Sequence, residues 1–478
     1  MSLTTKTLAE LSELLKSGAH TSREITEAFI AEIEAKDEGI NAFVTTTFDL
    51  AREQADASDS RRDQGTVLSP LDGIPITLKD IVCTKEVRTT ASSKMLENFV
   101  SPYDATIWTK LKEAGVVMLG KVNTDEFTMG ASTETSAFGI TKNPHDLERV
   151  AGGSSGGSAA SVGGNMCAAS IGTDTGGSIR QPAHFCGCTG LKVSYGRVSR
   201  YGTIPMASSL DTVGPLAKTP EDCAMMLQVL AGHDPKDATT PDVPVLDYTK
   251  GLNDSLKGLK IGVPKEYFIE GLDPEVAAVT NSAKEILRSL GADVVDISLP
   301  HSKYAVSVYY IVGPSEISAN MARFDGIRFG TAQGDKNLQE IYEESREAGL
   351  GDEVKRRILI GTYALSAGYY DAYYRKAQKV RTLICQDFEK AFADVDVILA
   401  PVSPTPSFKV GENSGGDPMK MYLEDILTIP ANLAGLPGLA VPMGKSKSNL
   451  PIGVQLIGKG FAEDEILKVG HQMYNAVQ

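Results

Sequence analysis

Two clusters of glycine and serine, separated by a short segment, constrain this chain more than any other feature. Residues 152–158 read Gly-Gly-Ser-Ser-Gly-Gly-Ser, and residues 173–178 read Thr-Asp-Thr-Gly-Gly-Ser. Glycine lets a backbone turn sharply and approach a ligand closely. A serine beside such glycines can be a nucleophile next to backbone N–H donors. The clusters therefore predict a reactive serine, and the next question is which group activates it.

Three known glycine-rich motifs do not account for the first cluster. A phosphate-binding loop needs Lys and then Ser or Thr after its last glycine, but Ser158 and Ala159 stand there. The spacing G-x-G-x-x-G of a dinucleotide site is absent from residues 152–157. The hydrolase pattern G-x-S-x-G fits around Ser155, but residues 145–150 are too polar for the buried strand that should precede it.

Lysine and histidine are the two possible activators of a serine here. His184 follows Ser178 by six residues, and a packing role is the better interpretation of it, although spacing alone leaves a catalytic base open. Lys79 ends the apolar run 73–79, where a strand leaves a core. A buried, neutral lysine can serve as a general base. For a lysine taken alone, the more common interpretation is a side chain that reaches solvent from a strand end.

Composition excludes several classes of protein. The 478 residues carry a formal net charge of −14, which argues against an extended nucleic-acid footprint on this chain alone. The six cysteines form no disulfide framework, and the pair Cys186 and Cys188 has no second pair for zinc, so no metal site is expected. The first residues lack an apolar signal core, and no run of about 18 apolar residues predicts a membrane span. We expect a cytoplasmic protein.

Alternating helix and apolar strand patterns predict α/β layering, and we expect one large α/β domain over residues 1–478, with a mixed twisted sheet and helices on both faces. Residues 1–60 form a helical N-terminal segment, in which Thr21 and Glu24 fit a capping box. Residues 232–257, rich in Asp, Pro, Thr and Lys, predict a surface crossing, which is either a boundary between domains or a loop within one large domain. A βαβ unit follows, whose helix begins with Asp273 as N-cap and Pro274. The expected strands are 71–82, 116–119, 259–263, 294–297 and 395–400, and a helix is expected at 105–114.

Three segments together resemble the amidase signature family. They are residues 73–80, 152–160 and 172–182, which agree with that family in order and spacing. The resemblance implies a signature core at 65–215 and a Ser–cis-Ser–Lys triad. Ser178 would be the nucleophile, Ser154, preceded by a cis peptide bond, would relay the proton, and Lys79 would be the base. The backbone N–H groups of Thr175, Gly176, Gly177 and Ser178 would form the oxyanion hole.

Further segments are similar to the glutaminase (A) subunits of glutamyl-tRNA(Gln) amidotransferases, which are ligases of protein biosynthesis. These segments are 123–127, 132–134, 195–202, 207–211, 323–326, 353–357, 365–374 and the pair Tyr309-Tyr310. The similarity implies a heterotrimer in which this chain hydrolyses glutamine and supplies ammonia to a B subunit, clasped by a C subunit. The B subunit would convert Glu-tRNA(Gln) to Gln-tRNA(Gln), with ATP and Mg bound there, no cofactor in this chain, and misacylated tRNA held mainly by B. Whether Asp-tRNA(Asn) is also converted to Asn-tRNA(Asn) stays open.

The same similarity implies a glutamine site. Tyr309, Arg357 and Asp425 would hold the α-amino and α-carboxylate groups, and the backbone of Met129 and Gly130 would line the pocket. Arg pairs well with a carboxylate, and Asp can hold an ammonium. The alternatives are an exposed basic pair for Arg357 and a core aromatic for Tyr309. Two rival functions are a stand-alone amidase acting on another amide and a catalytically silent scaffold protein.

Overall fold

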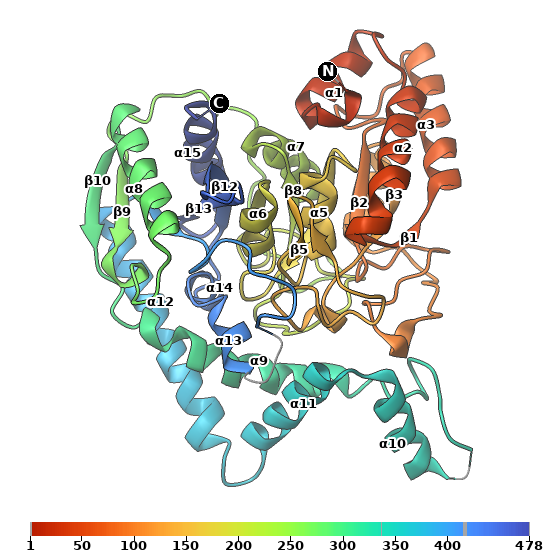
Figure 1. The fold of residues 1–478 in the computed structure, drawn as a ribbon, viewed down its shortest axis with the longest axis vertical. Coiled ribbons are helices and arrows are strands. Elements are labelled where there is room, and N and C mark those ends of the chain that lie inside the picture. Colours follow the sequence, from red (N-terminus) through yellow and green to blue (C-terminus); the bar gives the residue numbers. More distant parts are fainter. Residues whose placement is uncertain (1, 336, 414–417, 478) are drawn as a thin grey trace.

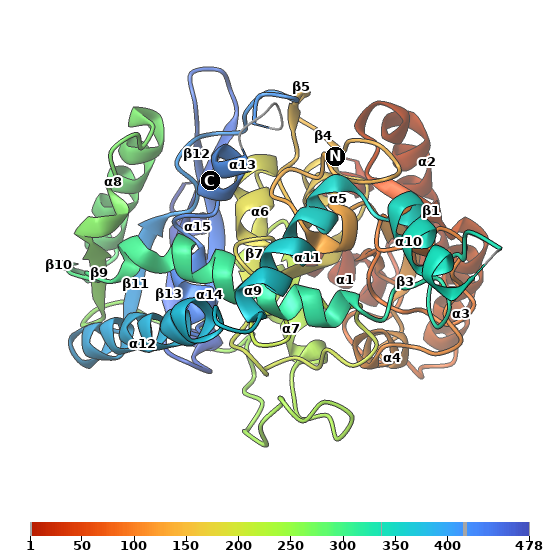
Figure 2. The same ribbon diagram turned by 90° about the horizontal axis from the view of Figure 1, so that it is seen from below.

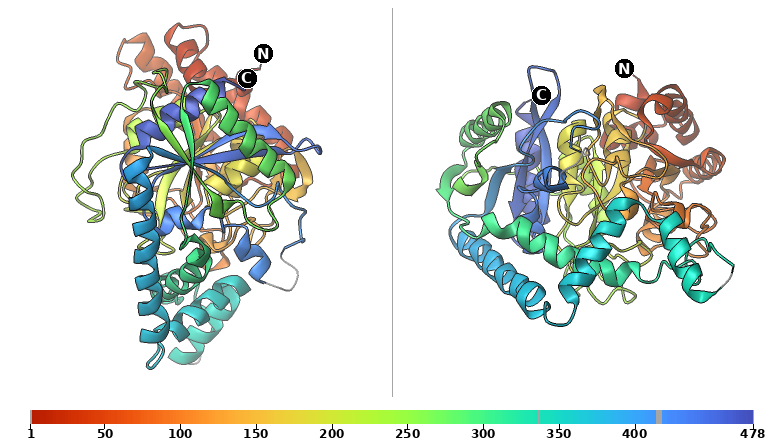
Figure 3. Two further views of the ribbon diagram at one scale, coloured as in Figure 1. Left: turned by 90° about the vertical axis from the view of Figure 1, so that its left-hand side faces the viewer. Right: turned by 60° about the horizontal axis from the view of Figure 1, so that its bottom comes forward.

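The computed structural model describes residues 2–335, 337–413 and 418–477. Within them, eleven strands form one mixed sheet, and two short strands form a separate hairpin. The sheet is strongly twisted, and helices cover both of its faces, as the views in Figure 1 and Figure 3 show. The predicted fold class is confirmed.

The large sheet contains β1 (Phe43–Thr46), β2 (Pro75–Lys79), β3 (Val117–Val122), β6 (Ala169–Asp174), β7 (Thr189–Lys192), β8 (Thr212–Ala217), β9 (Lys260–Pro264), β10 (Asp293–Ile297), β11 (Val397–Pro401), β12 (Gly438–Lys445) and β13 (Pro451–Gly458). The hairpin pairs β4 (Lys142–Asn143) with β5 (Asp146–Val150). The strand order is β1-β3-β2-β6-β8-β7-β12-β13-β11-β9-β10.

The helices are α1 (Leu8–Lys16), α2 (Ser22–Ile40), α3 (Phe48–Asp63), α4 (Thr106–Glu113), α5 (Gly156–Gly163), α6 (Arg180–Cys186), α7 (Pro220–Leu230), α8 (Pro274–Ser289), α9 (Ala305–Met321), α10 (Leu338–Gly349), α11 (Asp352–Leu365), α12 (Lys376–Asp394), α13 (Pro418–Leu423), α14 (Ile429–Leu433) and α15 (Glu463–Asn475). In the described part of the chain, none of them combines the length and apolar character that a membrane crossing requires.

The centre of the sheet positions the predicted site. Strand β2 runs parallel to both β3 and β6, so the carboxyl ends of β2 and β6 meet at one edge. Lys79 ends β2 and Asp174 ends β6, so this pairing brings Lys79 to the second glycine-rich cluster. Every residue of these strands is buried, since helices cover both faces.

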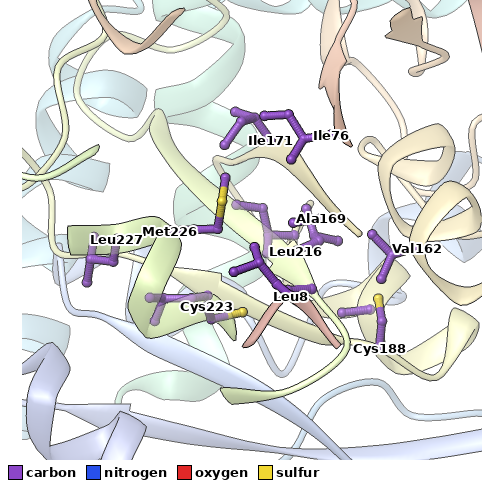
Figure 4. Close-up of a cluster of buried hydrophobic side chains, with 14 of the residues drawn as sticks. Leu8, Ile76, Val162, Ala169, Ile171, Cys188, Leu216, Cys223, Met226 and Leu227 are labelled. Carbon is purple, nitrogen blue, oxygen red and sulfur yellow. The ribbon is translucent and has the colours of Figure 1, made fainter. Parts of the chain in front are cut away.

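A hydrophobic core supports these central strands. Figure 4 shows side chains of β2, β6 and β8, among them Ile76, Ile171 and Leu216, gathered with residues from the covering helices. Val162 comes from α5 and Leu227 from α7. Dense interiors of this kind hold neighbouring backbone in place, which the glycine-rich clusters need.

The predicted helix starts and the predicted βαβ unit agree with the structure, because they were based on N-cap residues and on clear hydrophobic periodicity. The capping box of Thr21 and Glu24 is present in full, and the side chain of Asp273 accepts from Glu275 N at 2.7 Å. Strands β9 and β10 pair in parallel around α8, which confirms the βαβ unit. Among the described residues 232–257, no helix or strand occurs, and the loop after α7 extends from the body in Figure 2.

The prediction of one strand over 71–82 was too long. The chain before Pro75 turns around Asp72, whose carboxylate accepts from Leu68 N at 3.0 Å and from Arg61. After Lys79 the backbone turns again, because Ile81 N donates to Lys79 O at 2.7 Å. Apolar residues in these turns are buried like those of the strand, so their pattern did not reveal the boundaries.

Candidate active site

Lys79 lies at the centre of a buried group of hydroxyls. Its Nζ is 2.7 Å from Ser154 Oγ, 2.8 Å from Ser155 Oγ and 2.9 Å from Thr173 Oγ1. Burial lowers the pKa of Lys79 to about 7, although nearby carboxylates, Asp125 first, act in the opposite direction. The side chain is fully buried, so the interpretation as a solvent-reaching lysine was wrong. A lysine in this state can be neutral near pH 7 and accept a proton.

Ser154 follows a cis peptide bond to Gly153, as the family resemblance implies. The N–H of Gly153 donates to Gln181 Oε1 at 3.0 Å. A Cβ on Gly153 would lie 2.2 Å from Asp125 Oδ2 and 2.5 Å from Ser132 N. Only glycine fits this position, and the packing holds Ser154 against Lys79.

Ser178 is joined to this group through its backbone. It is buried with 6% of its surface exposed, whereas Lys79 and Ser154 have none exposed. Its carbonyl accepts from Ser155 N at 3.1 Å, which ties the two glycine-rich clusters together. Thr428 Oγ1 donates to Gly176 O at 2.6 Å, and Thr175 Oγ1 donates to Asp211 Oδ1 at 2.7 Å. These contacts hold the backbone whose N–H groups are the predicted oxyanion donors.

A buried ion pair lies next to this turn. Arg180 Nε is 3.1 Å from Asp174 Oδ2, and Asn432 Nδ2 donates to Asp174 Oδ1 at 2.8 Å. Burial alone would raise the pKa of Asp174, but the guanidinium of Arg180 outweighs it and brings the pKa to about 2. Asp174 is therefore a fixed negative charge that orders Ile179 and Arg180, the two residues that follow Ser178.

Tyr309 and Asp425 pack directly on the same turn. A Cβ on Gly176 would lie 2.9 Å from Cζ and Oη of Tyr309, and one on Gly177 would lie 3.0 Å from Asp425 Oδ1. That carboxylate oxygen is buried and has no hydrogen-bond partner among the described residues. Burial raises the pKa of Asp425 well above its usual range. A buried, unpartnered carboxylate oxygen beside Ser178 suits a cationic group of a ligand.

The side chain of Arg357 is buried, whereas that of its neighbour Arg356 is exposed. The Arg356 side chain is 42% exposed and that of Arg357 only 4%, so the interpretation as an exposed basic pair was wrong for Arg357. Arg357 Nε donates to Glu353 Oε1 at 2.8 Å. Its guanidinium carbon lies 5.5 Å and 5.6 Å from the ring centroids of Tyr310 and Tyr422. Helix α11 thus presents Arg357 to the interior, next to the helix α9 that carries Tyr309.

Comparison with known proteins identifies the family. The family model described as Amidase matches residues 24–467. The chain belongs to the amidase family. It is 57% identical to the A subunit of glutamyl-tRNA(Gln) amidotransferase from Geobacter metallireducens, over 100% of this chain and 98% of that protein. It is 55% identical to the protein of the same name from Roseiflexus sp., over 97% of this chain and 95% of the relative.

Solved structures agree. The crystal structure of the A subunit of glutamyl-tRNA(Gln) amidotransferase from Thermotoga maritima superposes with a TM-score of 0.82 at 40% identity, covering 99% of this chain and 95% of that one. The peptide amidase of Stenotrophomonas maltophilia gives a TM-score of 0.85 at 29% identity, covering 99% and 97%. Both the broad and the narrower resemblance predicted from the sequence are therefore confirmed.

Met129 and Gly130 of this amidase lie on a loop that packs against the cis peptide. A Cβ on Gly130 would lie 2.2 Å from Asp125 Oδ1, and Ala131 O accepts from Gln181 Nε2 at 2.9 Å. Met129 is buried in the same hydrophobic cluster as Tyr309. The structure thus brings the predicted triad, oxyanion turn and glutamine-binding residues into one region, while their roles remain predictions.

Sequence reasoning missed four contributors to this amidase site. Ser155 and Thr173 complete the surroundings of Lys79, Gln181 holds the Gly153 N–H, and Asp125 packs between Gly130 and Gly153. All four lie in segments that carried the family resemblance. Their residue types alone did not distinguish them from neighbouring residues as members of the site.

His184 has the packing role that the sequence favoured. It is buried, its Nδ1 accepts from Gly453 N at 2.8 Å, and its Nε2 is 3.2 Å from Thr405 O. Burial lowers the pKa of His184 to about 4. Among the described residues, no group of three or more His, Cys, Asp or Glu side chains is arranged to hold a metal ion.

A cavity of about 400 Å³ adjoins the buried hydroxyl group of this amidase. Thr173 and Asp211 line it, together with aromatic residues such as Phe324 and Tyr103. Ser178, Tyr309 and Asp425 are not among the residues that line it. Thr173, which contacts Lys79, therefore borders a partly open cavity.

Proposed function

We propose that this amidase is the glutaminase component of a glutamyl-tRNA(Gln) amidotransferase. The observation that carries the proposal is the packing of Tyr309 and Asp425 on the Ser178 turn, beside the Lys79–Ser154 pair. This arrangement joins an amide-cleaving group to a site suited to an amino acid. The near full-length similarity to A subunits of this enzyme supports the same function.

The reaction begins with the neutral amine of Lys79. Lys79 takes a proton from Ser154, and Ser154 takes one from Ser178, whose Oγ attacks the side-chain amide carbon of glutamine. Backbone N–H groups of Thr175, Gly176 and Gly177 stabilise the negative oxygen that forms; one such donor is worth about 10²–10³ in rate. The proton returns through Ser154 to the leaving nitrogen, and ammonia departs. Water then hydrolyses the glutamyl ester, releasing glutamate and free Ser178.

Three side chains select the substrate. Arg357 pairs with the α-carboxylate of glutamine, and Asp425 with the α-ammonium. The Tyr309 ring sits against Gly176, where its hydroxyl can reach the same groups. Since the bound ammonium favours the ionised form of Asp425, substrate binding lowers the pKa that burial raises.

The remaining steps belong to partner subunits. A B subunit would activate Glu-tRNA(Gln) with ATP and Mg and accept the ammonia, and a C subunit would clasp this chain to the B subunit. The acidic character of this chain fits a division in which the B subunit makes most of the tRNA contact. Conversion of Asp-tRNA(Asn) depends on which misacylated tRNAs the organism makes.

Ammonia release from glutamine tests the proposal, measured with and without the B and C subunits and Glu-tRNA(Gln). We expect glutamine hydrolysis that serves tRNA amidation in the complex and is lost in Ser178→Ala. A chain that prefers other amides and never joins B and C would be a stand-alone amidase. Failure of a glutamine-analogue electrophile to label Ser178 would indicate a silent scaffold.

A further inference from the structure

The hairpin formed by the end of α11, the turn after it and the start of α12 carries an exposed hydrophobic surface. Its side chains, called here the tyrosine surface, are Leu359, Ile360, Tyr363, Tyr369 and Tyr373. Their exposed fractions are 69%, 37%, 51%, 41% and 40%. Figure 1 and Figure 3 show that this hairpin extends from the body of the molecule, away from the sheet. Single exposed hydrophobic residues are ordinary, but a contiguous group of this kind is typical of a binding surface.

The members of the tyrosine surface touch or adjoin one another. The rings of Tyr363 and Tyr369 are 4.4 Å apart between centroids, and Tyr373 lies 6.0 Å from each. Leu359 and Ile360 precede Tyr363 by four and three residues on α11, so they share its helical face. The five side chains therefore form one continuous patch.

The surroundings of the tyrosine surface are basic, in contrast to the chain as a whole. Residues 355–383 contain seven lysine and arginine residues, of which Arg357 is buried, and one acidic residue, Asp371, whereas the whole chain has a net charge of −14. Lys376 and Lys379, on the first turn of α12, are exposed. The patch is thus an apolar and aromatic centre beside positive charge.

These properties discriminate between possible occupants. A second copy of this chain would place one basic region against another, which like-charge repulsion disfavours. RNA would match the charge and could stack on tyrosines, but it offers no apolar surface for Leu359 and Ile360. A protein with an apolar centre and acidic surroundings matches all three properties, and Tyr and Arg are enriched in protein–protein interfaces.

We infer that the tyrosine surface docks an acidic partner subunit of the amidotransferase, an assignment that rests on the proposed function. The same helix α11 also carries the buried residues Glu353 and Arg357. A partner seated on the tyrosine surface therefore adjoins the helix that places Arg357 without displacing that side chain. Glutamine hydrolysis would use the buried Arg357 of this helix, and docking would use its exposed side chains.

Binding of the full chain to purified B and C subunits tests the inference. The apolar variant combines Leu359→Ser with Tyr363→Ser, and the charge variant combines Lys376→Glu with Lys379→Glu. Tyr304→Ser is the matched control, because Tyr304 is 46% exposed and lies outside the tyrosine surface at the start of α9. Kd is measured at low and high salt, and glutamine-analogue labelling of Ser178 shows that each variant is folded.

We expect the apolar variant to raise Kd by about tenfold or more, which is typical of the loss of central interface residues. The charge variant should weaken binding mainly at low salt, and the control should bind like the wild type. Wild-type Kd for both test variants would overturn the inference and leave the proposed function intact. So would an effect confined to self-association or to tRNA binding. A wild-type chain that binds neither B nor C would overturn the proposed function itself and the docking assignment with it.

Discussion

The Nζ atom of Lys79 lies 2.7 Å from Ser154 Oγ in a fully buried setting, 75 residues away along the chain. The lysine reaches this place because β2 ends at the edge of the sheet where β6 also ends. Its environment contains hydroxyls and no histidine within hydrogen-bond distance among the described residues. This geometry supports the proposal that a lysine, and not a histidine, activates the serine in this amidase.

Replacing Lys79 with methionine should abolish catalysis while largely keeping the packing. Methionine has a similar length but no proton-accepting group, so loss of the base should lower kcat for glutamine hydrolysis by about 10²–10⁴ or more. Ammonia release measures the effect, and circular dichroism confirms the fold. A folded Lys79→Met protein with wild-type kcat would exclude Lys79 as the base.

The dependence of kcat/KM on pH should report the titration of Lys79. Burial lowers the pKa of Lys79 to about 7, so the neutral, active form accumulates above that pH. We expect kcat/KM for glutamine to rise with pH as one proton is lost near pH 7 and then to level off. A profile that is flat from about pH 5.5 to 8.5 would contradict this assignment.

Asp125→Asn should shift that profile toward lower pH. The Asp125 carboxylate is the first of the charges that raise the pKa of Lys79. Without this charge, burial should lower the pKa of Lys79 further. Asp125 Oδ2 also accepts from Thr133 N at 2.9 Å, a contact that the amide of asparagine preserves only in one orientation. The free energy of unfolding should fall by about 1–3 kcal/mol if the Thr133 N–H is left without an acceptor. An unchanged midpoint in kcat/KM would show that Asp125 acts on packing alone.

Gly153→Ala should destabilise the protein through overpacking. The added methyl group would lie 2.2 Å from Asp125 Oδ2 and 2.5 Å from Ser132 N, and neither neighbour is free to move away. We expect a loss of about 1–3 kcal/mol, measured by denaturant unfolding. Gly460→Ala is the control, because a Cβ there meets nothing within 4 Å. Equal stabilities of the two variants would contradict the packing argument.

Asp425→Asn should weaken glutamine binding more than it slows chemistry. The substitution keeps the shape but removes the charge that faces the Ser178 turn, so KM should rise by roughly 10–100-fold. A glutamine analogue without the α-amino group should show a much smaller difference between wild type and variant. The same loss for both substrates would indicate that Asp425 does not recognise the amino group.

Several features of this protein followed from local sequence. The cap formed by Asp273, the capping box at Thr21 and the period of α8 depend on neighbours within a few residues, and all were predicted. The motifs around Lys79, Ser154 and Ser178 identified the family, because their order and spacing are specific. Strand ends were predicted less well, since buried turn residues around 71–74 and 80–82 look like strand residues.

Only the tertiary structure decided the environment of each site residue. Arg356 and Arg357 are adjacent and chemically identical, yet helix packing exposes one and buries the other. Asp425 reaches Gly177 from a distant part of the chain, and its unpartnered oxygen is visible only once the chain is folded. The lowered pKa of Lys79 has the same origin, because desolvation is the result of all surrounding elements together. The sequence by itself determined the helix caps and the motifs that carry the candidate site residues. Long-range packing decided which of these side chains are in contact and which of them are charged.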